Sequence, residues 1–240
     1  MESNKSTNNT RDWYNKYSEQ QLNIGVNLRH YTIIDNLISS GLQKHHKVLE
    51  VGCGVGTLTM LIHKYLKKGK LVATDISDES VEKAKQWIPN SDKIDFFVSD
   101  MSDFSYSGKF DFIVLPDVME HIPVEEHSNL FNRLGKLMHD KSILVIHIPH
   151  PKALDYIRVN SPEKLQVIDQ SLNAAKMMED AYANDLLLIS YNSYCLFATV
   201  PDYVFIKMRL DRPVVISDIS KLQIIKKKLV RRIRYNLSRV

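Results

Sequence analysis

The chain has 240 residues, of which 44% are hydrophobic and 25% are charged, and its formal net charge is +4. This length supports one well-buried α/β core with a cap or a tail, and it does not favour two unrelated domains. The two cysteines lie far apart and lack the spacing of a metal knuckle, so we expect no disulfide framework and a reducing, cytoplasmic compartment.

The charge is unevenly distributed. Of the 32 basic residues, eight lie in residues 221–240 with no acidic residue among them, so residues 1–220 hold 24 basic and 28 acidic residues. An acidic body with a basic tail argues against a nucleic-acid groove across the core, and we expect no nucleic-acid partner. The start is polar, and the apolar stretch 186–200 is interrupted by polar residues and shorter than the roughly 20 residues that span a bilayer. We therefore expect a soluble protein.

Residues 1–44 are predicted to form a helical N-terminal cap. Ile33, Ile34, Leu37 and Ile38 follow one another at helical spacing, and Gly41 is a typical end signal. The first dozen residues are rich in Asn, Ser and Thr, and their composition predicts disorder.

A glycine-rich turn follows the first predicted strand, 47–51. Glycines at 52, 54 and 56 stand between this strand and a helix that begins at Thr57, an arrangement typical of a small-molecule cradle. The spacing is G-x-G-x-G, with Thr57 where the dinucleotide fingerprint has its last glycine. Glu50 precedes the turn, and its carboxylate suits a ligand with an ammonium and a sulfonium better than a pyrophosphate.

The remaining elements alternate between strand and helix. Strands are predicted at 71–75, 94–98, 110–115, 142–148, 186–191 and 203–210, and helices at 57–68, 77–88, 124–139 and near 172–183, whereas 152–168 lacks a clean period. Asp75 ends the second strand 25 residues after Glu50, close to the offset of about 20 at which an acid reaches ribose hydroxyls. This pattern predicts an α/β, Rossmann-like domain over 45–212, with a seven-stranded, mostly parallel sheet and helices on both faces.

The run Glu50-Val51-Gly52-Cys53-Gly54-Val55-Gly56 resembles the first motif of class I S-adenosylmethionine (SAM) dependent methyltransferases. The resemblance implies SAM as cofactor, S-adenosylhomocysteine (SAH) as product, an acid for the adenine amino group and an apolar side chain against the ring. The runs 148–151 and 165–170 also look similar to methyltransferases of bacterial polysaccharide assembly, which implies a small-molecule or glycan acceptor. The cofactor-binding residues so implied are Tyr17, Arg29, Glu50, Gly52, Cys53, Gly54, Gly56, Asp75, Ile76, Asp100, Met101 and Pro116.

Methyl transfer to a hydroxyl needs a group that removes the proton. His121 is our candidate base, because it lies in the loop after the fourth strand, where ligands bind in open α/β sheets. His150, after the next strand, is the second candidate, whereas His147 lies inside that strand and suits packing. We favour oxygen as the nucleophile, since an amine can lose its proton to solvent.

A metal-assisted alternative stays open at this point. The D-x-x-E-H run from Asp117 to His121 resembles the E-x-x-E-H ligand set of some methyltransferases, and with His150 it could hold a divalent cation that lowers the pKa of a hydroxyl. The same run also resembles the loop of many metal-free enzymes, and we favour no metal. Two other functions stay open: a regulatory protein that binds the nucleoside without turnover, and an NAD-dependent oxidoreductase, which Glu50 and Thr57 disfavour.

The tail, residues 213–240, is predicted to form a basic amphipathic helix. Its apolar residues recur at spacings of three and four: Leu222, Ile225, Leu229, Ile233, Leu237 and Val240. Two interpretations stay open. The tail contacts an anionic membrane or an acidic or lipid-linked substrate, so that the protein is membrane-peripheral, or it docks on its own domain or on a partner chain.

Overall fold

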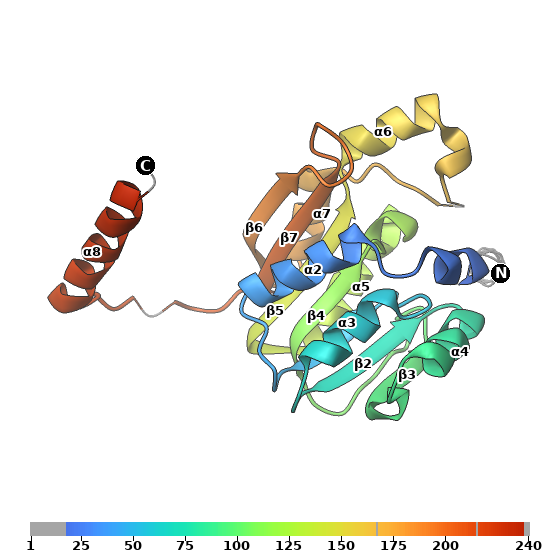
Figure 1. The fold of residues 1–240 in the computed structure, drawn as a ribbon, viewed down its shortest axis with the longest axis horizontal. Helices are drawn as coiled ribbons and strands as arrows, with labels where there is room; N and C mark the ends of the chain where they lie inside the picture. The colour runs from blue at the N-terminus through green and yellow to red at the C-terminus, as the bar shows by residue number, and fades with distance from the viewer. Residues whose placement is uncertain (1–17, 167, 215, 238–240) are drawn as a thin grey trace.

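The computed structural model describes residues 18–166, 168–214 and 216–237. Their core is a seven-stranded sheet in the order β3-β2-β1-β4-β5-β7-β6 (Figure 1). The strands are β1 (Lys47–Val51), β2 (Lys70–Asp75), β3 (Ile94–Val98), β4 (Phe110–Pro116), β5 (Met138–Pro149), β6 (Leu186–Tyr194) and β7 (Tyr203–Leu210). β1 to β5 pair in parallel, and β7 pairs antiparallel with both β5 and β6. The predicted Rossmann-like architecture is confirmed.

Helices cover both faces of the sheet, as predicted (Figure 1). One face packs against α2 (Leu28–Ser39), α3 (Thr57–Tyr65) and α4 (Asp78–Trp87), and the other against α5 (His127–Lys136) and α7 (Ala174–Tyr182). Successive strand residues point to opposite faces, so in β4 the side chains of Ile113 and Leu115 enter one hydrophobic cluster and those of Phe112 and Val114 the other.

The helices that border the turn begin at residues suited to that position. Ser77 caps α4, because its side chain accepts a hydrogen bond from the Ser80 N–H. Asn27 caps α2, and the ring of His30 accepts a hydrogen bond from the Asn27 N–H in return. Residues 18–24 are also helical. The local sequence therefore determines where the helices next to the glycine turn begin.

One prediction about the second half of the chain was wrong, and one helix was not predicted. The helix expected over 124–139 is shorter, because α5 ends at Lys136 and Met138 already pairs with Phe110 at the start of β5, ahead of a register shift. The stretch 152–168 contains a helix, α6 (Pro151–Asn160). Its period was missed because only Leu154 of this helix is buried, although the proline at its first position is a typical start signal.

The predicted tail helix is α8 (Lys221–Leu237), which lies apart from the rest of the molecule (Figure 1). Tyr17, Val240 and the dozen residues expected to be disordered lie outside the described residues. Within the described part of the chain, no helix combines the length and the apolar content needed to cross a bilayer.

Candidate functional site

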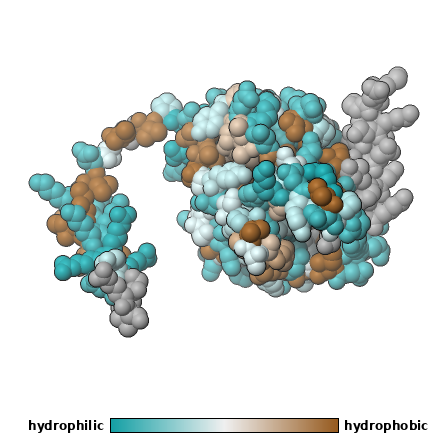
Figure 2. Space-filling model, turned by 90° about the horizontal axis from the view of Figure 1, so that it is seen from above, coloured by the Kyte–Doolittle hydropathy of each residue, from teal (hydrophilic) through white to brown (hydrophobic). Residues whose placement is uncertain are grey.

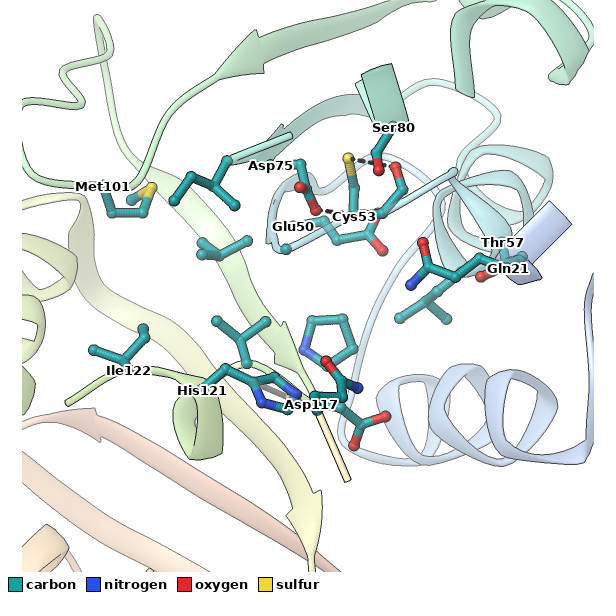
Figure 3. Close-up of a pocket in the computed structure, with 18 of the residues that line it drawn as sticks. Gln21, Glu50, Cys53, Thr57, Asp75, Ser80, Met101, Asp117, His121 and Ile122 are labelled. Atoms are coloured by element: carbon teal, nitrogen blue, oxygen red, sulfur yellow. Dashed lines mark hydrogen bonds between the residues drawn. The ribbon is translucent and has the colours of Figure 1, made fainter. Parts of the chain in front are cut away.

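A cavity of about 730 Å³ opens where the parallel strands end. Ligands of open α/β sheets bind at this edge. Figure 3 shows Glu50, Cys53 and Asp75 together on one side of the cavity and Asp117 and His121 on another. The predicted residues that line it are Arg29, Glu50, Gly52, Cys53, Gly54, Asp75, Ile76, Asp100, Met101, Pro116 and His121. Eleven predicted residues from five stretches of the chain thus share one cavity.

The glycine turn holds its shape through backbone conformation. Gly52 has φ +77°, and a Cβ at this position would clash with Cγ2 of Val118 in the loop after β4. Gly56 has φ +83°, and a Cβ there would lie 2.6 Å from Cδ1 of Ile88. Gly56 therefore allows the close packing of α3 on α4, and it does not line the cavity that we expected it to border.

Glu50 is fully buried at the cavity wall. Neither oxygen of its side chain makes a hydrogen bond within the described residues. Burial raises the pKa of Glu50 to about 8, and the nearby Thr59 hydroxyl opposes this shift only in part. Buried polar groups usually have partners, so an unpartnered carboxyl beside a cavity is a site for a donor that a ligand brings.

Asp75 ties the glycine turn to the start of α4. Its Oδ2 accepts a hydrogen bond from the Gly54 N–H at 2.7 Å, and its Oδ1 accepts one from the Ser77 N–H at 2.8 Å. Burial raises the pKa of Asp75, and these backbone hydrogen bonds counteract the shift. Each carboxylate oxygen keeps a second lone pair, so Asp75 can still accept hydrogen bonds from a pair of hydroxyls.

The segment after β3 forms a further wall. Asp100 is exposed and its Oδ1 accepts a hydrogen bond from the Ser102 N–H at 2.8 Å, whereas Met101 is buried with φ +67°. The backbone oxygen of Met101 accepts a hydrogen bond from Arg133 at 3.2 Å, which fixes the turn from the side of α5. This wall combines an acidic acceptor with an apolar surface.

Asp117 joins three elements at the opposite wall. Arg29 of α2 forms an ion pair with Asp117 Oδ2 at 2.7 Å, and His147 Nδ1 of β5 lies 2.7 Å from Asp117 Oδ1. Burial opposes ionisation of Asp117, but Arg29 and then His147 outweigh it and hold the pKa of Asp117 well below its usual range. The ionised carboxylate only accepts hydrogen bonds, so His147 donates from Nδ1, and Tyr194 donates to His147 Nε2 across 2.6 Å.

His121 and His150, the two candidate bases, lie in different surroundings. The Nδ1 of His121 contacts the backbone oxygen of Ile168 and lies 3.3 Å from Asp169 Oδ1. A carbonyl can only accept, so Nδ1 carries the proton and Nε2 is the basic nitrogen. His150 instead caps α6, where its Nδ1 accepts a hydrogen bond from the Lys152 N–H, and it does not line the cavity. Of the two histidines, only His121 therefore remains a candidate base.

The metal arrangement considered for Asp117, Glu120, His121 and His150 does not form. Asp117 is engaged by Arg29 and His147, and His150 points its ring nitrogen to the α6 backbone. Within the described ranges, no three His, Cys, Asp or Glu side chains come together as metal ligands.

Sequence reasoning missed several residues of the cavity. Gln21, Ser80, Gln166 and Phe197 all line it. Gln166 belongs to the run 165–170, which gave it no role in the site, and the other three belong to no motif, so only the fold brings these residues together. The role of His147 was also missed, because a histidine inside a strand gives no sign of its partners.

Comparisons with known proteins agree with this geometry. Residues 48–141 match a family described as "Methyltransferase domain". A malonyl-[acyl-carrier protein] O-methyltransferase of Ilyobacter polytropus is 29% identical over 52% of this chain and 43% of its own length. A magnesium-protoporphyrin O-methyltransferase of Synechocystis sp. is 28% identical over 61% of this chain and 66% of its own. The chain thus spans about two fifths of the malonyl-specific relatives that it matches.

Solved structures share the fold at low sequence identity. The Synechocystis magnesium protoporphyrin IX methyltransferase with bound SAH has a TM-score of 0.58 at 19% identity, covering 75% of this chain and 81% of that one. The N-methyltransferase NodS of Bradyrhizobium japonicum with SAH has a TM-score of 0.60 at 18% identity, covering 77% and 86%. The fold and the cavity define a Rossmann-like domain with a cavity at the carboxyl ends of its parallel strands. Residues 48–141 match the methyltransferase domain family, and the fold is shared with SAM-dependent methyltransferases of known structure.

Proposed function

We propose that this protein binds SAM and transfers its methyl group to a hydroxyl oxygen of a small-molecule acceptor. The observation that carries the proposal is the placement of Glu50, Asp75 and Asp100, which follow or end three neighbouring strands and line one cavity. The names of two relatives, which act on oxygen, support the choice of nucleophile. The likeness to NodS supports the fold alone.

The residues of the cavity fit the chemical groups of SAM. The unpartnered carboxyl of Glu50 suits an ammonium, and the buried Nε of Arg29, which makes no hydrogen bond within the described residues, suits the methionine carboxylate. Asp75 suits the ribose hydroxyls, and Asp100 with Met101 suits the adenine. When bound, SAM supplies an activated methyl group on a positively charged sulfur. The protein has to position the acceptor, exclude water and remove a proton.

His121 is proposed as the base that removes this proton. Its Nε2 is the basic nitrogen, and its Nδ1–H is held by the Ile168 oxygen and by Asp169. The Asp169 carboxylate favours the imidazolium that forms when Nε2 takes the proton of the attacking hydroxyl. The segment that carries Asp169 is held against the β4 loop, because Gln170 donates hydrogen bonds to backbone oxygens of Glu120 and Ile122.

The reaction is tested with methyl-labelled SAM and panels of acceptors that carry hydroxyl, carboxyl or amino groups, including sugars and acyl-carrier conjugates. We expect label in an oxygen-linked methyl group, identified by mass spectrometry, together with an equal amount of SAH. Label only on nitrogen would contradict the choice of nucleophile. A protein that binds SAM and labels nothing in acceptor-containing cell fractions would be the non-catalytic binder.

The role of His121 is tested with His121→Ala. We expect turnover at saturating acceptor to fall by about 10²- to 10⁴-fold, the usual contribution of a general base, while the affinity for SAH stays unchanged. His150→Ala is the matched control, because it removes a nearby histidine outside the cavity, and we expect it to keep its activity. Full turnover of His121→Ala would remove His121 from the reaction.

A further inference from the structure

The tail helix α8 has an apolar face against which none of the described residues packs. Leu222, Ile225, Leu229 and Ile233 follow at intervals of three, four and four residues, which places them on one side of a helix. Leu222 is 79% exposed and Leu229 is 57% exposed. Every residue from 221 to 236 is exposed. Figure 2 shows hydrophobic and hydrophilic residues side by side along this helix, away from the body.

The same helix is strongly cationic. It contains seven Lys or Arg and no acidic residue, and Lys227, Arg231 and Arg234 fall on the side opposite the apolar face. Lys226 lies near the border of the apolar face, where a long aliphatic stem can follow the apolar surface and keep the ammonium in water. The helix therefore offers apolar and positive surface to one partner at once.

Local sequence starts this helix without help from the body. Ser220 Oγ accepts a hydrogen bond from the Gln223 N–H, and Gln223 Oε1 accepts one from the Ser220 N–H at 2.9 Å, which is a capping box. The connecting segment is held at its start by the ion pair between Arg212 and Asp140. A single 17-residue helix is only marginally stable in water, so α8 gains most from a surface that covers its apolar face.

Charge decides between the candidate partners. A second copy of α8 would bring seven cations against seven others, and a nucleic acid would cover the cations and leave the apolar face in water. The acidic body matches the charge of α8, but the apolar face is exposed beside it. An anionic bilayer matches both features, because its headgroups pair with the cations and its acyl boundary accepts the apolar side chains.

We propose that α8 lies in the plane of an anionic bilayer surface and holds the methyltransferase domain there through residues 211–220. The helix is an interfacial anchor and does not cross the bilayer. This proposal is independent of the acceptor and of the catalytic residues.

The test is co-sedimentation of the full chain with vesicles of phosphatidylcholine, with and without phosphatidylglycerol. We expect binding at least about tenfold tighter to the anionic vesicles, weakening as salt rises, with a gain of helix in far-ultraviolet circular dichroism. The double variant Leu229→Glu, Ile233→Glu is expected to lose binding to both vesicles. The triple variant Lys227→Glu, Arg231→Glu, Arg234→Glu is expected to lose the preference for anionic lipid.

Val159→Glu is the control, since it adds an acid at an exposed apolar position of α6, outside the tail, and is expected to bind as the unmodified chain does. Retained SAH binding by all variants shows that the domain is folded. Equal binding to neutral vesicles, unchanged binding of the Leu229→Glu, Ile233→Glu variant, or binding to duplex DNA but not to vesicles would each overturn the proposal. The proposal would also be overturned if the chain did not bind vesicles and eluted as a dimer held by α8.

Discussion

At the scale of single residues, Glu50 is a buried carboxyl at the cavity wall without a hydrogen-bond partner in the described part of the chain. Burial raises its pKa from 4.5 to about 8 in the folded protein. The folded state therefore holds the proton more tightly than the unfolded state, and unfolding releases it. The contribution of Glu50 to stability is therefore greatest below pH 4.5 and is lost as the pH rises to 8.

This pH dependence of the contribution of Glu50 to stability gives a prediction for Glu50→Gln in the ligand-free protein. At pH 8 the variant is expected to be more stable than the unmodified chain by on the order of 2 kcal/mol, with no gain near pH 4.5, because it removes the cost of a buried charge. Urea denaturation at the two pH values measures it. Glu82→Gln, at an exposed ion pair of α4, is the control and is expected to change little. Equal pH slopes for Glu50→Gln and the unmodified chain would contradict the burial argument.

At the scale of elements, Asp117 connects segments that are distant in sequence. It follows β4, pairs with Arg29 of α2 and accepts a hydrogen bond from His147 of β5. Because Arg29 and His147 depress the pKa of Asp117, its contribution to stability is present above the usual carboxyl range and is lost as the pH falls through its lower folded value. The N-terminal cap is thereby attached to the edge of the sheet that bears the cavity.

Asp117→Asn is expected to destabilise the protein by about 3 kcal/mol, because it leaves Arg29 and His147 beside a neutral group. The destabilisation should be largest at neutral pH and shrink as the pH falls from 3.8, the pKa of the unfolded carboxyl, to about 2, the pKa of Asp117 in the folded protein. Chemical denaturation followed by circular dichroism measures both. Asp140→Asn, which breaks the exposed pair with Arg212, is expected to cost less than about 1 kcal/mol. If Asp117→Asn were as stable as Asp140→Asn, the contacts of Asp117 with Arg29 and His147 would contribute nothing to the stability of the fold.

Elements with a strong local signal could be predicted from sequence. The bounds of β1, β3 and β7 agree with the expectation because short apolar runs flanked by turn residues mark them. The α6 helix and the early start of β5 could not be predicted, since one buries a single residue and the other depends on pairing with Phe110. The same distinction between local signal and tertiary contact applies to the residues of the site. Glu50 and Asp75 lie at the carboxyl ends of β1 and β2 in a regular pattern, whereas the partners of Asp117 and His121 come from tertiary contacts.

At the scale of the whole molecule, a domain with one large cavity is joined to an exposed basic helix. The sheet brings the ends of β1, β2 and β4 to one edge, and α2 closes over that edge through Arg29. In the proposed function, local strand and turn segments build the side of the cavity that would hold the cofactor, and the loop after β4 with Gln166 and Ile168 builds the side that would face the acceptor. This division agrees with a common cofactor and an acceptor that differs between relatives.

We propose that Glu50, Asp75 and Asp100, at or just after the carboxyl ends of β1, β2 and β3, together bind one adenosyl sulfonium compound. Isothermal titration of the full chain with SAH and, separately, with NAD tests it most directly. We predict one SAH per chain, no heat with NAD, and at least about tenfold weaker SAH binding for Glu50→Gln and Asp75→Asn. Asp95→Asn, which removes a β3 carboxylate that pairs with Lys70 outside the cavity, should bind SAH as the unmodified chain does. Binding of NAD in place of SAH, or SAH binding unaffected by both variants, would contradict the account.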